Sequence, residues 1–160
     1  MNIVIRDAIK EDVGQMLNLI KELAEFEKAL HEVELSESDL LESGFGIKPA
    51  YKSFVAEVDG KIAGMALVYP RYSTWKGESL HLEDLIVNQK FRGLGIGTAL
   101  LDEVVKYGHE LGVRRINWEV LDWNEPAIAF YENKGANVLR DWDVVQLNEK
   151  AIAEYIAQLK

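Results

Sequence analysis

The chain has no cysteine among its 160 residues. That absence excludes a disulfide framework, a thiolate zinc site and catalysis through a cysteine acyl-enzyme. The three histidines, His31, His81 and His109, are not spaced as metal ligands, so we expect no metal site. The N-terminal stretch MNIVIRDAIKEDV has charges within its first seven residues and contains no long apolar run. We therefore expect a cytoplasmic protein with neither a signal peptide nor a membrane span.

Positive charge is also scarce. Lys and Arg number 18 against 27 Asp and Glu, which gives a net charge of −9. This balance disfavours a nucleic-acid partner, whose phosphates attract Lys and Arg, and it weakly favours a cationic substrate. A hydrophobic content of 48% is ordinary for a globular protein, and the length suits one domain. We expect residues 1–160 to form that single domain.

The apolar residues follow strand and helix periods in turn, which predicts an α/β protein with a mixed sheet. Asp59-Gly60 between two apolar runs predicts a hairpin, and Pro70 is expected to end its second strand, leaving RYSTWKGES as a loop. The unit from Leu82 to Val120 should join parallel strands by a right-handed crossover. The expected strands are 2–6, 53–58, 61–69, 79–87, 114–120, 137–139 and 142–147. The expected helices are 12–27, a short one that Ser36 caps, one from the glycine-rich loop to about 111, 123–135 and 149–158.

A glycine-rich loop follows the expected strand at 82–87. Gly93, Gly95 and Gly97 alternate directly after Arg92. Glycine permits positive φ and close approach to the main chain, and N–H groups at a helix start favour a phosphate. Arg92 can add a charge-assisted contact. The loop lacks the lysine of a Walker P-loop and the glycine spacing of a Rossmann fingerprint. The alternative to a phosphate-binding loop is a simple turn without a ligand.

The remaining pattern, Arg-x-x-Gly-x-Gly, resembles the coenzyme A pyrophosphate loop of the GNAT acetyltransferase superfamily. The resemblance spans nearly the whole chain and is closest to the diamine (spermidine/spermine and thialysine) acetyltransferases. The matching stretches are LIKELAEFE, DLLESGFG, LEDLIV, RGLGIGT and WNEPAIAFYENKGA.

This resemblance implies the GNAT (acyl-CoA N-acyltransferase) fold, a mixed, mostly antiparallel sheet flanked by helices. A central parallel strand pair would be splayed to admit the cosubstrate, acetyl-CoA. The resemblance also implies a homodimer. Within the cofactor site, main-chain groups of the central strand would bind the pantetheine and acetyl carbonyl, and the glycine-rich loop would hold the pyrophosphate. Asn124 and the WNEP turn would contact the pantetheine, although Asn124 fits a helix N-cap equally well. The implied cofactor-binding residues are Leu85, Ile86, Val87, Arg92, Gly93, Leu94, Gly95, Ile96, Gly97, Thr98, Asn124, Pro126, Ala127 and Tyr131.

Acetyl transfer to an amine needs two proton movements, because a protonated amine with a pKa of about 10 cannot attack and a thiolate leaves better once protonated. By resemblance, Tyr131 is the acid, and Glu83 accepts the amine proton through water. Asp84 would bind the cationic substrate or support that water. Strand alternation places Glu83 and Asp84 on opposite faces unless a β-bulge intervenes, as it usually does in GNAT proteins. The alternatives are a core or rim aromatic at Tyr131 and a solvated strand end at the two acids.

The amine end of the pocket matches the subfamily at Phe26, Glu27 and Trp75. Two acids of the subfamily pattern are missing. Ser73 stands where one is expected, two residues before Trp75, and the segment between Leu139 and Trp142 is shortened. These departures favour a shorter diamine, thialysine or a lysine-like amine over spermidine. His81 could act as a second base, but we favour a histidine on the sheet surface.

The sequence therefore predicts an enzyme that moves the acetyl group of acetyl-CoA directly to a primary amine of a small cationic substrate. One alternative is a protein or peptide N-acetyltransferase. Another is a non-catalytic acetyl-CoA sensor, which would need neither Glu83 nor Tyr131.

Overall fold

The computed structural model describes residues 2–159, which form two compact units. The first unit ends at Glu119 and the second begins at Val120. Each unit is described by itself.

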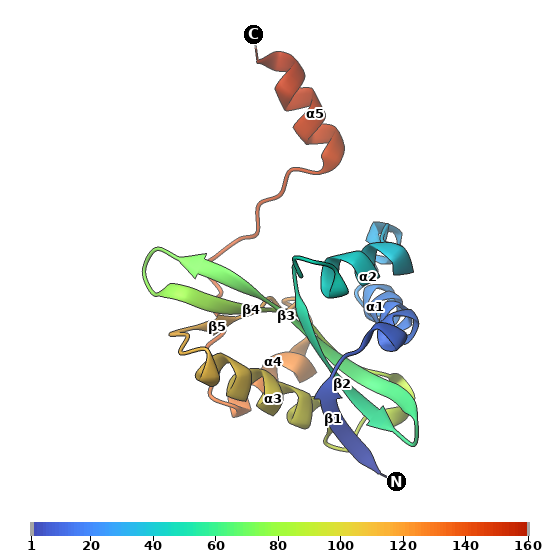
Figure 1. Ribbon diagram of the computed structural model, residues 1–160. Helices are drawn as coiled ribbons and strands as arrows, with labels where there is room; N and C mark the ends of the chain where they lie inside the picture. The colour runs from blue at the N-terminus through green and yellow to red at the C-terminus, as the bar shows by residue number, and fades with distance from the viewer. Residues whose placement is uncertain (1, 160) are drawn as a thin grey trace. The chain divides into compact units, whose positions relative to one another are not determined.

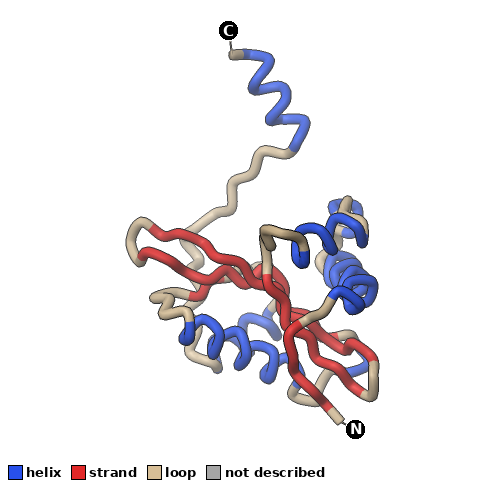
Figure 2. Tube along the Cα trace, viewed as in Figure 1, coloured by secondary structure: helices blue, strands red, loops and turns tan. Residues whose placement is uncertain are grey.

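The first unit is built on one mixed sheet of five strands, which Figure 2 shows as a continuous layer. The spatial order follows the chain order, and three antiparallel pairings precede one parallel pairing between the last two strands. This arrangement confirms the predicted mixed, mostly antiparallel sheet. The strands are β1 (Ile3–Asp7), β2 (Lys52–Val58), β3 (Lys61–Ser73), β4 (Gly77–Val87) and β5 (Ile116–Asn117).

Helices cover both faces of this sheet (Figure 1). α1 (Val13–Phe26) and α2 (Glu37–Phe45) lie on one face, and α3 (Ile96–Glu110) lies on the other. On the α1 face, Met16 and Leu19 pack against Val55, Met65 and Ile86 of the sheet. Each buried side chain of this size contributes about 2 kcal/mol to folding, so α1 is held mainly by this contact. Short 3-10 turns lie at Lys10–Asp12 (η1), Leu30–Glu32 (η2) and Gln89–Phe91 (η3).

The local signals for these elements are confirmed. Ser36 caps α2 in a reciprocal pair with Asp39, whose carboxylate accepts from the Ser36 amide at 2.8 Å while its own amide donates to the Ser36 hydroxyl at 3.2 Å. Asp59 and Gly60 join β2 to β3, both with positive φ, as a tight hairpin turn requires.

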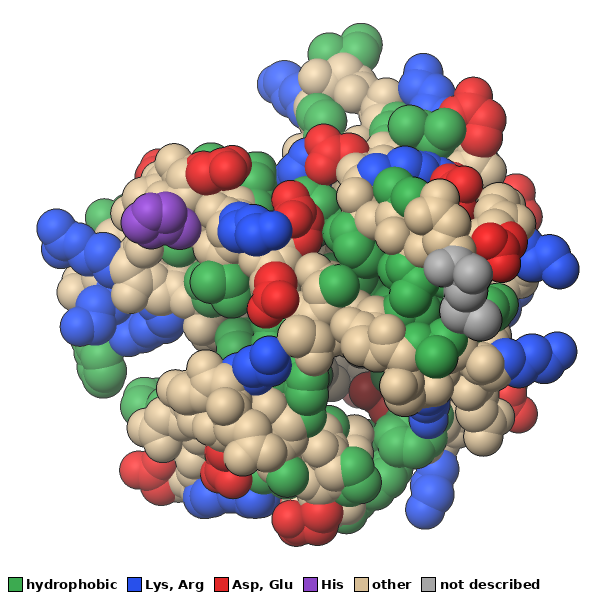
Figure 3. All heavy atoms as spheres, turned by 90° about the horizontal axis from the view of Figure 1, so that it is seen from below, with side chains coloured by type: hydrophobic (Ala, Val, Ile, Leu, Met, Phe, Trp, Pro, Cys, Tyr) green, Lys and Arg blue, Asp and Glu red, His purple; other side chains and the backbone are tan. Residues whose placement is uncertain are grey.

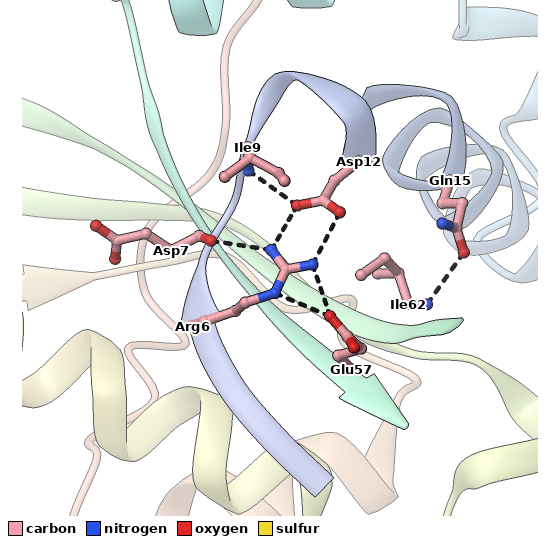
Figure 4. Close-up of polar contacts among 7 residues, drawn as sticks. All are labelled: Arg6, Asp7, Ile9, Asp12, Gln15, Glu57 and Ile62. Atoms are coloured by element: carbon pink, nitrogen blue, oxygen red, sulfur yellow. Dashed lines mark hydrogen bonds and ion pairs between the residues drawn. The ribbon is translucent and has the colours of Figure 1, made fainter. Parts of the chain in front are cut away.

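Arg6 ties β1 to the start of α1 and to β2 (Figure 4). Its guanidinium donates to both carboxylate oxygens of Asp12, at 2.7 and 3.0 Å, and to Glu57 at 2.8 and 3.0 Å. Burial alone would raise the pKa of Asp12, but hydrogen bonds from Arg6 and from the Ile9 amide outweigh burial and hold that pKa below its usual range. The charged form of Asp12 therefore stabilises this corner of the fold.

The β3–β4 hairpin is longer than predicted, and the predicted loop RYSTWKGES is wrong. β3 continues through Pro70 to Ser73, and β4 begins at Gly77. The amide of Leu80, which lies opposite Pro70, donates to Arg115 rather than to β3. The missing N–H of Pro70 therefore faces away from β4, toward a side that β2 does not reach, because the first residue of β2, Lys52, lies opposite Val68. Proline is tolerated at such an unpaired strand edge.

The strand predicted at 114–120 is also shorter, because β5 covers only Ile116–Asn117. Its parallel pairing with β4 joins Leu80 to Ile116 and His81 to Asn117. Among the described residues, β5 therefore leaves β4 unpaired on that side from Leu82 onward, which is the splayed strand pair that the resemblance implied.

The second unit contains two helices, α4 (Glu125–Asn133) and α5 (Glu149–Gln158), which match the predicted positions. The strands predicted at 137–139 and 142–147 are wrong. Figure 2 draws this stretch as loop, and its large apolar side chains from Leu139 to Leu147 are exposed. A strand requires a neighbouring strand for its hydrogen bonds, and the described part of the chain offers this stretch none.

Candidate active site

A β-bulge shapes the middle of β4. Leu82 lies opposite Val68 and Asp84 lies opposite Leu67, so Glu83 is an extra residue without a partner on β3. Residues directly opposite one another in a sheet share a face, and Leu67 packs in the cluster under α1. Asp84 therefore lies on the α1 face. The bulge expected between Glu83 and Asp84 is present.

Two neighbouring carboxylates act on Asp84 at this place. The pKa of Asp84 is raised to about 6, first by burial and then by the negative charges of Glu83 and Glu27. Glu27 directly follows α1, and desolvation raises its pKa as well. A site with this arrangement favours a cation, since a positive charge would relieve the repulsion among the acids.

Two side chains of the sheet contact the carboxylate of Glu83. The Tyr69 hydroxyl donates to its Oε2 at 3.0 Å, and Nε2 of His81 lies 3.3 Å from the same oxygen. Burial, followed by the bond to Glu83, raises the pKa of Tyr69. His81 is 6% exposed, so the expectation of a histidine on the sheet surface is wrong. The ring of Tyr69 packs beside it, with the two ring centres 5.0 Å apart.

Tyr69 was not anticipated as a site residue. The signal that could have found it is the β3–β4 turn. Once Ser73 pairs with Gly77, counting back along the hairpin places Tyr69 opposite His81. The pairing of Tyr69 with His81 does not follow from the sequence prediction, because that prediction ends the strand at Pro70.

The glycine-rich loop connects η3 to α3. Gly93 and Gly95 adopt φ of +80° and +79°, a left-handed conformation that costs other residues free energy, and Gly95 is the N-cap of α3. The first bond within the helix runs from the Ala99 amide to the Gly95 carbonyl at 3.0 Å. The amides of Ile96, Gly97 and Thr98 precede that bond, so they have no acceptor within the helix and suit an anion.

Arg92 directly follows η3 and bonds back to the last residue of β4. Its Nε donates to the Val87 carbonyl at 3.1 Å, and its guanidinium carbon lies 5.8 Å from the centre of the Phe26 ring. The structure thus brings Arg92 beside a predicted substrate residue as well as beside the loop. Its contact with a phosphate stays a prediction.

The comparisons with known proteins agree with this geometry. A sequence model described as the acetyltransferase (GNAT) family matches residues 15–136. The chain belongs to the GNAT acetyltransferase family. It is similar to thialysine N-epsilon-acetyltransferase of Bos taurus, with 37% identity over 95% of this chain and 96% of that protein. It is also similar to the Homo sapiens spermidine/spermine N(1)-acetyltransferase-like protein 1, with 34% identity over 94% of this chain but 23% of that longer protein.

Among solved structures, an aminoglycoside acetyltransferase from an uncultured soil metagenomic sample has a TM-score of 0.75 and covers 91% of this chain and 97% of its own. Because only 17% of the residues are identical, this structural likeness supports the fold alone. The relatives and the family match together make this GNAT protein an acyltransferase enzyme that transfers acetyl groups to amines.

Within the second unit of the acetyltransferase, Asn124 caps α4. Its Oδ1 accepts from the Ala127 amide at 3.4 Å, and Pro126 lies in the first helical turn. The N-cap interpretation of Asn124 is therefore confirmed. Tyr131 lies on the same helix, is 9% exposed and has its ring centre 5.3 Å from that of Phe130.

Ser73 of the acetyltransferase has a structural role in the β3–β4 turn. Its hydroxyl accepts from the amides of Trp75 and Lys76, each at 3.2 Å, and from Arg115 Nη1 at 3.4 Å. The residue that replaces the expected acid thus closes the turn that presents Trp75, which is 74% exposed.

No described helix of the acetyltransferase is both long and apolar enough to cross a bilayer. Within residues 2–159, no three His, Asp or Glu side chains gather as potential metal ligands. Acidic and basic side chains are interspersed over the face drawn in Figure 3.

Proposed function

We propose that this acetyltransferase moves the acetyl group of acetyl-CoA directly to a primary amine of a small cationic substrate. The observation that carries the proposal is the bulge at Glu83. It allows Glu83 and Asp84, adjacent on one strand, to act together with Glu27 as a carboxylate group suited to an ammonium ion.

Acetyl-CoA is the cosubstrate that GNAT acetyltransferases use. The residues present fit it, because the amides at the start of α3, which have no acceptor within the helix, and the left-handed glycines before them suit a pyrophosphate. In this proposal the stretch from Arg92 to Thr98 holds the pyrophosphate. Main-chain groups of Leu85, Ile86 and Val87, on the side of β4 that β5 leaves unpaired, bind the pantetheine. Asn124, Pro126 and Ala127 of the second unit contribute by family resemblance.

The reaction we propose is a direct transfer. The amine gives a proton to Glu83, through a water molecule, and its nitrogen lone pair attacks the thioester carbon. A C–N bond forms, the C–S bond breaks, and the Tyr131 hydroxyl gives its proton to the departing sulfur. The attacking nitrogen then loses its second proton to the Tyr131 phenolate, and Glu83 releases the first proton to solvent. The products are an amide and the free thiol of coenzyme A. Asp84 and Glu27 bind the positive charge of the substrate.

A diamine or a lysine-like amine such as thialysine is the proposed substrate. The name of the bovine relative supports it, as does the place of Ser73, which closes a turn and offers no charge to a long polyamine. We further propose that residues 1–160 act as one catalytic domain and that the enzyme is a homodimer in the cytoplasm.

The test is release of coenzyme A thiol by the purified protein with acetyl-CoA and a panel of thialysine, lysine, putrescine, spermidine and a lysine peptide. We expect turnover with at least one small amine and about a hundredfold loss of kcat in Glu83→Gln, since general base catalysis contributes on this scale. Turnover with the peptide alone would overturn the proposed substrate class. Full activity of Glu83→Gln would overturn its role as base.

A further inference from the structure

His81 is a buried histidine between two polar partners. Its Nδ1 lies 2.9 Å from the side-chain nitrogen of Asn117, and its Nε2 lies 3.3 Å from Oε2 of Glu83. The mechanism proposed above does not use His81. Its position must therefore be explained by what it does to its neighbours.

The two contacts define the tautomer of the ring. The Asn117 side-chain nitrogen can only donate, so Nδ1 of His81 must accept. The proton of the neutral ring then lies on Nε2, which donates to Glu83. Of the two neutral tautomers, only the one with its proton on Nε2 can accept from Asn117 and donate to Glu83.

The ring is fixed by its place in the sheet. His81 lies opposite Tyr69 on β3 and opposite Asn117 on β5, so the three side chains form a row across adjacent strands. The rings of Tyr69 and His81 have centres 5.0 Å apart. Tyr69 also donates to Oε2 of Glu83, at 3.0 Å. Both donors thus reach one oxygen of Glu83, which leaves Oε1 as the oxygen able to accept a proton.

We propose that His81, with its tautomer set by Asn117, is a positioning residue that holds Glu83 so that Oε1 faces the amine. This inference rests on the proposed role of Glu83 as base. The Glu83 side chain is 52% exposed and sits on a bulge, where an unheld carboxylate would sample several rotamers. A buried, ordered donor restricts it to one of them.

The test compares His81→Leu, which removes the donor, with His81→Gln, whose terminal amide nitrogen can replace Nε2. We expect His81→Leu to lower kcat about tenfold, the value of one hydrogen bond to a charged group, and His81→Gln to recover most of that loss. The KM for the amine and the Kd for acetyl-CoA should stay within about twofold, because His81 binds neither of them. Ser79→Ala is the matched control. It removes another buried β4 hydrogen bond, that of the Ser79 hydroxyl to the Arg71 carbonyl at 2.9 Å, and should keep the wild-type kcat.

A second measurement does not depend on activity. Nitrogen-15 NMR of the imidazole rings in the folded full-length protein should show His81 as the neutral Nε2–H tautomer, identified by the signal that His81→Gln removes. Asn117→Asp, whose carboxylate accepts from Nδ1, should change that tautomer and lower kcat. An Nδ1–H tautomer in the wild-type protein would overturn the inference even if His81→Leu failed to fold.

The outcomes separate this inference from the proposed function. If Glu83→Gln is fully active, the role of Glu83 as base is wrong and the inference fails with it. If Glu83→Gln is inactive while His81→Leu retains its full kcat, only the inference about His81 is wrong. An equal loss of kcat in His81→Leu and His81→Gln would also contradict the inference. It would mean that the packing of the ring matters, because glutamine restores the hydrogen-bond donor but not the ring.

Discussion

Asp84 and His81 lie on the same face of β4, although three positions separate them in the chain. Each lies opposite a β3 residue of the α1 face, Asp84 opposite Leu67 and His81 opposite Tyr69. Regular alternation would place residues three apart on opposite faces. The extra residue, Glu83, reverses the alternation and thereby places an acid with a pKa of about 6 on the α1 face of the strand.

Asp84→Asn should stabilise the protein, and increasingly so as the pH rises. The pKa of Asp84 in the fold, about 6, is above its usual 3.8, so its stabilising contribution is complete at low pH and is lost as the pH rises through about 6. We expect a gain on the order of 2 kcal/mol at about pH 8 and little below about pH 4. Urea denaturation across this range measures it. Asp102→Asn, on the exposed surface of α3, is the control, and an equal gain at every pH would contradict the assignment.

Asp12→Asn should have the opposite pH dependence. The pKa of Asp12 is held below its usual 3.8, so its contribution is present above that value and is lost as the pH falls. Leaving Arg6 without its bidentate partner should cost about 3 kcal/mol at neutral pH. The free energies of unfolding of the variant and the wild type should converge as the pH falls below the usual 3.8 and Asp12 becomes protonated in the fold. A gap that persists in acid would show that packing, rather than charge, dominates this corner.

Gly95→Ala should weaken acetyl-CoA binding more than it weakens the fold. A left-handed residue with a side chain costs about 1 kcal/mol, and at the N-cap of α3 the strain would turn the amides that we assign to the pyrophosphate. We expect the Kd by calorimetry to rise about tenfold or more. Gly112→Ala has nearly the same φ, +71°, and equally open surroundings after α3. It should share the stability loss but keep the affinity, and equal affinities in the two variants would remove the loop from the cofactor site.

Tyr131→Phe should lower kcat about tenfold or more while the Kd for acetyl-CoA stays the same, since the change removes only the proposed acid. The phenyl ring preserves the packing of α4 next to Phe130. Thiol release at saturating substrate measures the loss. An unchanged rate would rule out the acid role, and Phe130→Leu shows what disturbed packing alone does to the rate.

Much of the fold was accessible from the sequence because its signals are local. Ser36 and Asp39 cap a helix through residues three apart, Asp59-Gly60 closes a hairpin, and a glycine-rich loop precedes α3. Each depends on dihedral angles and hydrogen bonds between near neighbours. A resemblance of short motifs likewise selected Glu83, Asp84 and Tyr131, whose roles in the site stay predictions.

The tertiary structure decided what depends on pairing between distant segments. Only the strand register revealed that β3 continues through Pro70, that 137–147 lacks a strand partner, and that Tyr69, His81 and Asn117 form one row. A strand's neighbours come from other parts of the chain, and a single extra residue changes every face that follows it. The sequence by itself therefore determined the helices and the family, whereas the strand ends and the orientation of Glu83 were decided by how the strands align.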